Sequence, residues 1–520
     1  MTLTDLLNHW SLAENPFRGE EARADDVFAR MSGGGAAGDA DGLATGVHHS
    51  DFEKILGDPL RPGPAVVFGE KGSGKTAIRL QLVRRIDEHN TKHPGARILV
   101  VIYDDLNGVL GRLHDRIGAK SAKDSLQKIR LVDHIDAILS LAVPRLVDSV
   151  LREGPARNAI DLGANPLRTI RGIDRAQRES VLLLQALYDR PDIAPLRTAR
   201  LRSKLRLGFD GRKMLVRMLL VLMPLLVLAG LVWRRWYAPP TMSSWALTVL
   251  DWSLVGLTAL FAVVALKVGV WDKLALLRTA HRVKRQLRVV SRGDVSFAKS
   301  IRGLPAGVRE IAALPVTDSD EPRFAMLTRL LRILRPLGYA GVFVIVDRID
   351  EPTLVGGDPE RMKAVVWPML SNKFLQMEGV GVKLLLPVEL RHAVFRESSA
   401  FFQEARLDKQ GLIERLSWTG ASLYDLCEAR LRACLKTGSP DRQLIDLFAE
   451  DVARPELIDA LDRMKQPRDA FKLLYRCLID HCANVTQGEN QWRIPRHILM
   501  QVLKSENERL QQFQQGIRPG

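Results

Sequence analysis

Hydrophobic residues occur along this chain in two patterns, short apolar runs and longer segments with helical spacing. Four short, largely apolar runs predict buried strands, and they cover residues 65–68, 98–103, 342–346 and 381–388. Residues 77–83, which follow the first run, have the spacing of a helix. Apolar strands that alternate with helices are typical of a parallel sheet. The pattern therefore predicts an α/β core.

Most of the remaining chain has apolar residues at three- and four-residue spacing, which predicts helices. The segment between residues 107 and 195 reads as a helical insertion, with its clearest helices at Val132–Leu151 and Ala176–Leu187. Residues 413–419 look like a further strand, and 423–435 a helix after it. Two more helices, at 473–483 and 497–511, predict a helical C-terminal lid.

Two longer apolar runs have the length of membrane spans. The first, counted from Met214 with Arg217 reaching back to the interface, covers about 20 residues, or about 30 Å of helix. The second, 245–266, has Asp251 as its only charge. Aromatic residues gather towards the edges of both runs, at Trp233, Trp236, Tyr237, Trp245, Trp252 and Trp271. We expect a transmembrane hairpin at 214–270; the alternative is a buried hairpin in a soluble protein.

The charge of the chain supports the hairpin. The formal net charge is +16, and residues 197–217 and 267–292 each carry eight Lys/Arg and one Asp, so the surplus flanks the apolar runs. Under the positive-inside rule both flanks, and hence both termini, are expected on the cytoplasmic side of the membrane. We expect this to be a bacterial-type cell membrane, with its lipids as partners of the chain. Residues 274–290 form a basic amphipathic helix, either on the membrane surface or solvated on a soluble domain.

The first strand runs into Gly69-Glu70-Lys71-Gly72-Ser73-Gly74-Lys75-Thr76, which fits the phosphate-binding P-loop pattern G-x-x-x-x-G-K-[ST]. Gly69, Gly72 and Gly74 let backbone N–H groups surround a phosphate chain, and the following helix directs its positive end at the same place. Lys75 would reach the β- and γ-phosphates of ATP, and Thr76 would hold Mg²⁺. The strand and the helix around the loop supply the context that the motif requires.

The third strand runs directly into Asp347-Arg348-Ile349-Asp350-Glu351. An acid at the end of such a strand has the Walker B form, in which Asp347 would share the Mg²⁺ ion with Thr76. Asp350 or Glu351 could then orient the attacking water. The alternative is a buried strand with an acidic turn.

These two motifs resemble known families. The run Asp347-x-x-Asp350-Glu351 looks like the D-G-h-D-E variant of STAND-class NTPases, including the NACHT group, although Arg348 replaces their usual small residue. The chain is also similar to KAP-type NTPases, whose transmembrane segments lie between Walker A and Walker B, as the apolar runs do here. Those proteins usually have a second Asp where Arg348 stands. Both resemblances imply an AAA-like P-loop NTPase, with a role in signalling or defence.

Further site candidates come from the AAA-type resemblance. Pro467-Arg468 resembles the sensor-2 element, whose arginine touches the γ-phosphate; the alternative is a helix-starting proline beside an exposed arginine. Glu389 or Arg391 could be a polar sensor after the fourth strand. Arg406 and Arg415 are candidates for an arginine that acts in trans. Asn15-Pro16-Phe17 resembles the entry segment that packs beside adenine.

The four cysteines, Cys427, Cys434, Cys477 and Cys482, lack zinc-site or disulfide spacing and predict buried thiols in a reducing compartment. The predicted organisation is an N-terminal segment (1–46), a first part of the NTPase core (47–106), a helical insertion (107–213), the transmembrane hairpin (214–270), a basic juxtamembrane helix (271–317), a second core part with Walker B (318–420) and the lid (421–520).

The leading functional hypothesis is a membrane-anchored ATPase that uses ATP and Mg²⁺ as a nucleotide switch, in a homo-oligomer or with a partner protein. The first alternative is a nucleic-acid-dependent ATPase of the origin-recognition type, which the position of the basic blocks does not favour. The second is a membrane scaffold with a degenerate nucleotide site.

Overall fold

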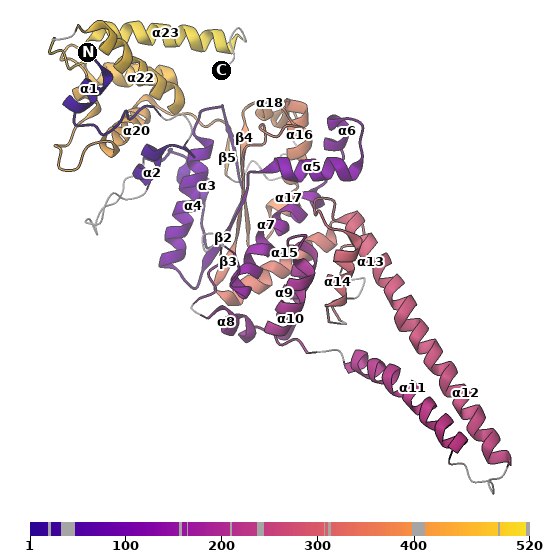
Figure 1. Ribbon diagram of the computed structural model, residues 1–520. Helices are drawn as coiled ribbons and strands as arrows, with labels where there is room; N and C mark the ends of the chain where they lie inside the picture. Colours follow the sequence, from indigo (N-terminus) through magenta and orange to yellow (C-terminus); the bar gives the residue numbers. More distant parts are fainter. Residues whose placement is uncertain are drawn as a thin grey trace. The chain divides into compact units, whose positions relative to one another are not determined.

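The computed structural model of the chain describes residues 1–18, 22–32, 47–154, 159–163, 165–208, 211–236, 244–305, 307–309, 314–397, 411–486 and 489–515 (Figure 1). The chain separates into two compact units. We call the first, Met1–Asp104 together with Val342–Gly520, the sheet unit, and the second, Asp105–Gly341, the insertion unit. The insertion unit thus leaves the sheet unit and returns to it between the second and third strands.

A five-stranded parallel sheet forms the centre of the sheet unit, with strand order β2-β3-β4-β1-β5. Val67 of β1 is in register with Leu385 of β4, and Val344 of β3 with Val382 of β4. The strands are β1 (Ala65–Gly69), β2 (Arg97–Tyr103), β3 (Tyr339–Val346), β4 (Val380–Pro387) and β5 (Leu412–Ile413). Their positions agree with the α/β core and parallel sheet that the apolar runs predicted.

Burial on both faces explains why these strands have continuous apolar sequences. All five residues of β1 and all eight of β4 are buried, including Lys383. Helices cover the sheet, with α4 (Lys75–Lys92) against β2, and α17 (Asn372–Leu375) and α18 (Glu389–Phe395) against β4. The other helices around the sheet are α3 (Phe52–Leu56), α16 (Pro359–Val366) and the 3₁₀ turn η5 (Trp367–Leu370).

The two ends of the chain pack together in a second, helical core of the sheet unit (Figure 1). Leu6, Trp10 and Phe17 from the N-terminal segment share this core with residues between Trp418 and Leu503. The terminal amino group of Met1 donates to the carbonyl oxygen of Val485 over 2.7 Å. The helices are α1 (Leu3–His9), α2 (Asp26–Ser32), α20 (Gly420–Ala433), η6 (Leu444–Leu447), α21 (Arg454–Met464), α22 (Pro467–Asn484) and α23 (Arg496–Gln514).

The strand predicted at 413–419 is shorter than expected. β5 covers only Leu412–Ile413, and residues 415–419 run on without strand geometry. The reason is that this segment contacts β1 and the loop after it through irregular bonds. The N–H of Leu416 donates to the Phe68 carbonyl over 2.7 Å, and Trp418 Nε1 donates to the Ser73 carbonyl over 2.9 Å.

Apart from the first three residues of β3, the regular elements that the structure describes in the insertion unit are helical. Its elements are α5 (Leu106–Ile117), α6 (Ala122–Leu126), α7 (Leu131–Leu151), α8 (Pro166–Gly172), α9 (Arg175–Tyr188), α10 (Ala194–Lys204), α11 (Gly211–Trp236), α12 (Ser244–Leu266), the π-helical segment η2 (Lys267–Trp271), α13 (Asp272–Gln286), α14 (Asp294–Arg302), α15 (Glu321–Leu334) and η4 (Arg335–Leu337). Helices α7 and α9 confirm the helices predicted at 132–151 and 176–187.

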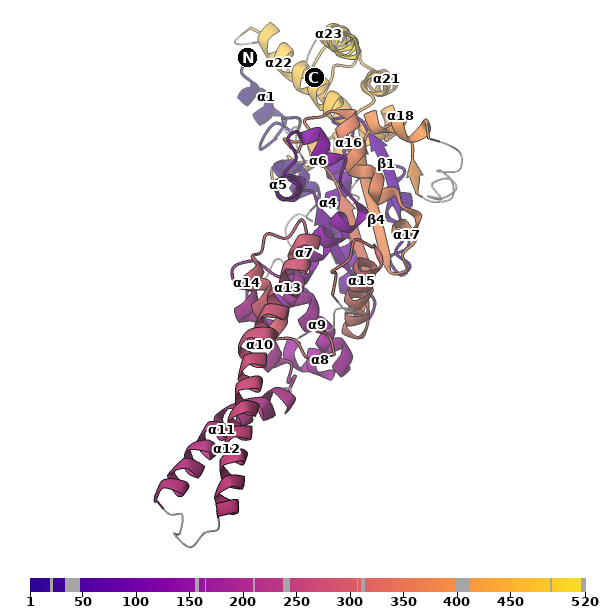
Figure 2. The same ribbon diagram turned by 90° about the vertical axis from the view of Figure 1, so that its right-hand side faces the viewer.

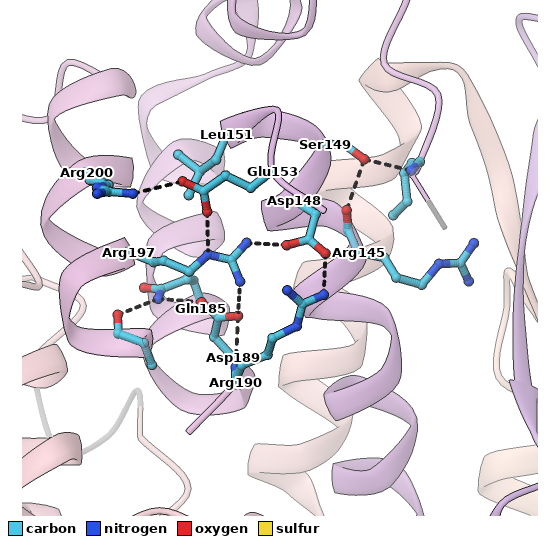
Figure 3. Close-up of polar contacts among 12 residues, drawn as sticks. Arg145, Asp148, Ser149, Leu151, Glu153, Gln185, Asp189, Arg190, Arg197 and Arg200 are labelled. Carbon is cyan, nitrogen blue, oxygen red and sulfur yellow. Dashed lines mark hydrogen bonds and ion pairs between the residues drawn. The ribbon is translucent and has the colours of Figure 1, made fainter. Parts of the chain in front are cut away.

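A buried ionic network joins α7, α9 and α10 (Figure 3). The guanidinium of Arg197, which is 1% exposed, donates to Asp148 over 2.5 Å and to Asp189 over 2.7 Å. Its Nε lies 3.3 Å from Glu153. A buried arginine with several carboxylate partners is costly to disrupt, because removing one partner leaves an uncompensated charge. The network therefore links α7, α9 and α10 within the insertion unit.

One helix is long and apolar enough to cross a membrane, at Asp251–Gln286, and none of its most apolar window is buried within the described structure. The second expected span is not established, because the apolar part of α11 is the shorter stretch Met218–Trp233. Arg217 before it and Arg234-Arg235 after it limit its length. In Figures 1 and 2, α11 and α12 run side by side, away from α7, α9 and α10 of the same unit.

The basic helix predicted at 274–290 forms as α13, but one of its faces is covered by protein. Ala280 and Val283 are fully buried, and the helix packs against α14. Of the two alternatives for this helix, the contacts favour a place on the helical insertion rather than flat on a membrane surface.

Candidate functional site

The loops that follow β1, β3 and β4 meet at the carboxyl edge of the sheet, where ligands bind in open α/β sheets. A cavity of about 550 Å³ lies there. Its walls come from the loop after β1, the residues after β3, the N-terminal segment and the start of α22; among them are Lys75, Thr76, Asp347, Asp350 and Arg468. The structure thus brings together residues that are distant in the sequence.

The loop after β1 has the geometry of an anion cradle. Gly72 and Gly74 have φ of +95° and +96°, a region that only glycine adopts without strain. Helix α4 begins at Lys75 directly after Gly74, with no side-chain cap and no acidic residue in its first turn. The positive end of the helix is therefore directed at the loop without a competing carboxylate on the helix itself.

The ammonium group of Lys75 lies inside this loop. Its Nζ donates to the carbonyl oxygens of Gly69 over 2.7 Å and Glu70 over 2.9 Å. Burial lowers the pKa of Lys75, while the carboxylates of Asp350 and Asp347 act in the opposite direction. A phosphate would offer this ammonium charged acceptors in place of neutral carbonyls.

Thr76 and Asp347 face each other across the cavity. The Thr76 hydroxyl lies 3.4 Å from Asp347 Oδ2. The other oxygen of Asp347 accepts from the Arg348 N–H over 2.9 Å, which fixes the orientation of the carboxylate. Burial raises the pKa of Asp347, and the nearby Arg79 guanidinium opposes that effect. A hydroxyl and a carboxylate beside a phosphate cradle fit a magnesium ion that keeps several waters.

Arg79 is a site residue that the sequence patterns did not indicate. It lies one turn after Lys75 on α4, is 3% exposed and forms an ion pair with Asp104 at the end of β2. Its Nε also lies 3.4 Å from Asp347 Oδ2. Two carboxylates from different strands thus share one buried arginine. The only signal in the sequence was the position of Asp104 directly after an apolar strand.

The residues after Asp347 have a tight and unusual backbone. Arg348 has φ of +61°, a backbone region that favours glycine over residues with a side chain. The Arg348 guanidinium pairs with Glu351 over 3.2 Å. Asp350 and Glu351 both line the cavity. Among the nearby carboxylates, Asp350 has the largest opposing effect on the lowered pKa of Lys75.

Residues from the segment after β5 and from the start of α22 contact the loop after β1. The side chain of Arg468 lies against Gly72, where an added Cβ would come within 2.9 Å of Arg468 Cβ. Gln466 and Arg415 both contact the carboxylate of Glu70 in the loop. Trp418 donates to the Ser73 carbonyl from the other side. Of these contacts, the sequence had indicated Arg468 and Arg415 only.

One part of the cavity wall, here called its apolar end, carries apolar side chains beside the buried ion pair of Arg430 with Asp25. Phe28, Val47, Leu426 and Phe471 line it. Arg430 stacks on the Phe471 ring at 4.4 Å and donates to the Pro16 carbonyl over 2.7 Å. The Asn15-Pro16-Phe17 segment thus reaches this end through a backbone contact.

The remaining residues that the sequence suggested as site residues lie in different places. Glu389 lines the cavity, but Arg391 pairs with Glu414 over 2.9 Å and is not among the cavity-lining residues. Arg415 is half exposed and pairs with Glu70 within the same chain. Arg406 lies outside the described residues. The four cysteines are free and buried, and the described residues contain no group of three His, Cys, Asp or Glu suited to a metal.

The chain matches no protein-family model, no curated protein and no solved structure. Its function is therefore inferred from the geometry of the site.

Proposed function

We propose that this chain is a Mg²⁺-dependent ATP-binding protein that hydrolyses ATP, and that it is anchored in a membrane through its insertion unit. The observation that carries the nucleotide part is the pairing of Thr76 with Asp347 at 3.4 Å beside Lys75 and the glycine cradle. These groups come from both motifs, and a structural role alone would not require a lysine, a threonine and an aspartate around one cavity.

Each residue has a role in the proposed reaction. The loop N–H groups and Lys75 hold the phosphates, and Thr76 with Asp347 holds Mg²⁺, which neutralises charge on the β- and γ-phosphates. Asp350 or Glu351 orients a water molecule for attack on the γ-phosphorus. The bond from phosphorus to the β-γ bridging oxygen breaks, and ADP and inorganic phosphate leave. Arg468 lies against Gly72 and is placed to sense the γ-phosphate.

Two features suit the proposed switch. The apolar end around Phe28 and Phe471 provides a place for a purine ring. The loop contacts Gln466, Arg468 and Trp418 from the C-terminal helical core, so a nucleotide that remodels the loop would alter contacts to that core. Differential contacts of this kind are what allow a ligand to shift a conformational equilibrium.

The membrane part of the proposal is supported by α12 and its continuation. Trp245, Trp252 and Trp271 are exposed near its ends, with the apolar helix between them. Exposed apolar surface of this length is costly in water and is expected in lipid. In the proposed topology α11 and α12 both cross the membrane, and both termini lie in the cytoplasm.

The first experiment compares Lys75→Ala with Lys92→Ala, which removes an exposed lysine at the far end of the same helix. We expect Lys75→Ala to weaken binding of a fluorescent ATP analogue in the presence of Mg²⁺ by at least about 100-fold, since it removes a charge-assisted contact to phosphate. Lys92→Ala should bind as the wild type does. Equal binding by all three proteins would refute the site.

A second experiment separates an ATPase from a scaffold with a degenerate site. Asp347→Asn keeps the size of the side chain but removes the charge that holds Mg²⁺. We expect phosphate release to fall to the background rate while ATP binding without Mg²⁺ persists. Stimulation of the wild-type turnover by duplex DNA, with protein that is soluble without detergent, would instead favour the nucleic-acid-dependent alternative.

A further inference from the structure

A second cavity lies within the insertion unit, with a volume of about 920 Å³. It is formed by the segment before α7, the end of α13 and the segment before α15. Its lining residues are Gln127, Lys128, Ile129, Arg130, Arg282, Arg285, Gln286, Arg288, Val316, Thr317 and Asp318. Five of these carry a positive charge and one carries a negative charge, so this cavity is strongly cationic.

The cations differ in whether they have a partner. Arg288 pairs with the buried carboxylate of Asp133, and Arg130 pairs with Asp318 over 3.0 Å. Arg282, Arg285 and the ammonium group of Lys128 have no ion pair within the described part of the chain. Like charges held around one cavity repel one another, and salt screens most of this repulsion only for charges more than about 8–10 Å apart.

The walls of the cavity are anchored by buried contacts. Arg323, which is fully buried, donates to the carbonyls of Thr317 over 2.7 Å and Gln286 over 3.1 Å. Arg288 donates to the Lys128 carbonyl over 3.0 Å. These bonds connect all three segments that form the cavity. The free cations therefore project from a fixed frame rather than from a mobile loop.

We propose that this cavity binds a small, multiply charged phosphate compound, held by Arg282 and Arg285 on one side and Lys128 and Arg130 on the other. A guanidinium group can donate two parallel hydrogen bonds to two oxygens of one phosphate. The anion would compete with Asp318 for Arg130. The volume lies at the upper end of small-molecule sites, so one phosphate group would leave most of it empty.

The lining residues also limit the class of ligand. None of those that the structure describes around this cavity is aromatic, in contrast to the apolar end of the first cavity. A base would find no ring to stack on, so the chemistry favours a polyphosphate or a multiply phosphorylated sugar. This site is independent of the proposed ATP site, since no residue lines both cavities.

The phosphate could belong to a soluble compound or to a lipid headgroup. Helix α12 ends at Leu266, and Arg282 lies about 24 Å further along the continuous helix. A headgroup at the end of the apolar segment would not reach that far without leaving the interface, which favours a soluble compound. The shared chemistry, several phosphate charges on clustered arginines, is the same for both sources.

The test uses the full-length chain in detergent with Lys75→Ala, which should weaken phosphate binding at the proposed ATP site. Inorganic tripolyphosphate is titrated by calorimetry into this parent, into Arg282→Gln/Arg285→Gln, and into Lys299→Gln/Arg302→Gln. The last variant removes two exposed charges from α14 of the same unit. We expect at least about a 10-fold loss of affinity in the first variant only. Because the two arginines are exposed and unpaired, its melting temperature should match that of the parent.

Equal losses in both variants would show diffuse charge attraction and overturn the site, as would the absence of binding to the parent. The source is then resolved in vesicles of phosphatidylcholine with and without phosphatidylglycerol. An equal fall in affinity for tripolyphosphate in the parent and in Lys299→Gln/Arg302→Gln, caused by the anionic lipid, would identify a headgroup at the site and overturn the soluble ligand. A larger fall in the parent than in Lys299→Gln/Arg302→Gln would show that the lipid acts through the charges of α14 and would leave the soluble ligand in place. Unchanged affinity identifies a soluble ligand.

Discussion

Arg79 and Asp347 are joined by a contact of 3.4 Å between Nε of the arginine and Oδ2 of the aspartate. The same carboxylate oxygen lies 3.4 Å from the Thr76 hydroxyl. Asp347 therefore faces a buried cation from α4 at the position where a magnesium ion would approach Thr76. Arg79 in turn pairs with Asp104, so its charge balances two carboxylates of neighbouring strands.

This relationship predicts that Arg79→Met destabilises the protein and that Mg²⁺ with ATP restores part of the loss. Removing one member of a buried ionic group leaves an unpaired charge, at a cost of about 3–5 kcal/mol. A bound Mg²⁺ ion would supply positive charge near Asp347 again. Thermal unfolding with and without Mg²⁺ and ATP should therefore show a larger ligand-induced shift in Arg79→Met than in the wild type.

Arg79→Lys is the matched control, because it keeps the charge and loses only the guanidinium geometry. It should lose less stability than Arg79→Met. If Mg²⁺ with ATP raises the melting temperature of all three proteins by the same amount, Arg79 does not interact with the proposed metal site.

A second prediction concerns Gly72. Its φ of +95° is strained for any residue with a side chain, and an added Cβ would meet Arg468 at 2.9 Å. We expect Gly72→Ala to cost about 1–3 kcal/mol and to weaken nucleotide binding, since the cradle must shift away from Arg468. Both effects are measured by thermal unfolding and by titration with a fluorescent ATP analogue.

Gly95→Ala is the control for that substitution. It lies in the turn between α4 and β2, and a Cβ there would meet no atom within 4 Å. It should leave stability and binding close to wild-type values. If Gly72→Ala behaves in the same way, the close contact with Arg468 does not constrain the loop.

A third prediction follows from Lys383 in the middle of β4. Its side chain is buried, and its Nζ donates to the Leu56 carbonyl over 3.0 Å and lies 4.8 Å from the centre of the Phe343 ring. Burial lowers the pKa of Lys383 to about 7 from the ordinary 10.5. The folded protein thus binds fewer protons at this site than the unfolded chain does between pH 7 and 10.5, so this lysine makes stability rise with pH across that window, by up to about 1.4 kcal/mol per unit.

Lys383→Met should remove this slope. The variant should be more stable than the wild type at pH 7, because no ammonium group needs to be buried or neutralised. The difference should shrink as the pH rises towards 10. Melting temperatures at several pH values measure it, with Lys92→Met as an exposed control. Parallel pH curves for wild type and Lys383→Met would contradict the lowered pKa.

A fourth prediction tests the proposed topology. Burial raises the pKa of the native thiols Cys427 and Cys434, to about 12 and about 11, so they should react poorly with maleimides. A cysteine introduced by Ser244→Cys, at the start of α12, should be labelled from outside intact cells by a membrane-impermeant maleimide. Lys299→Cys in α14 should be labelled only after the cells are opened.

Labelling of Lys299→Cys in intact cells would reverse the predicted orientation. Absence of labelling at Ser244→Cys in intact cells, with the protein present and labelled after permeabilisation, would remove the hairpin from the proposal.

Much of the fold could be predicted from local patterns. The continuous apolar runs that became β1, β2, β3 and β4 are readable because both faces of a parallel sheet are covered. The glycine-rich loop between β1 and α4 could also be predicted, because a φ near +95° requires glycine at that position of the sequence. The brevity of β5 could not be predicted, because the bonds of Leu416 to β1 and of Trp418 to the loop after β1 depend on a segment more than 300 residues away.

The sequence by itself thus determined β1 to β4, the glycine-rich loop after β1, the acid at the end of β3 and the long apolar helix, all of which depend on short-range periodicity or on backbone conformation. Only the tertiary structure decided that Arg79 lies between Asp104 and Asp347, that the N-terminal segment and α22 line one cavity with the loop, and that cations from α13 and from the segment before α7 share another. Those relationships arise from packing between distant segments. An arginine on an amphipathic helix looks the same in sequence whether it faces solvent or two buried carboxylates.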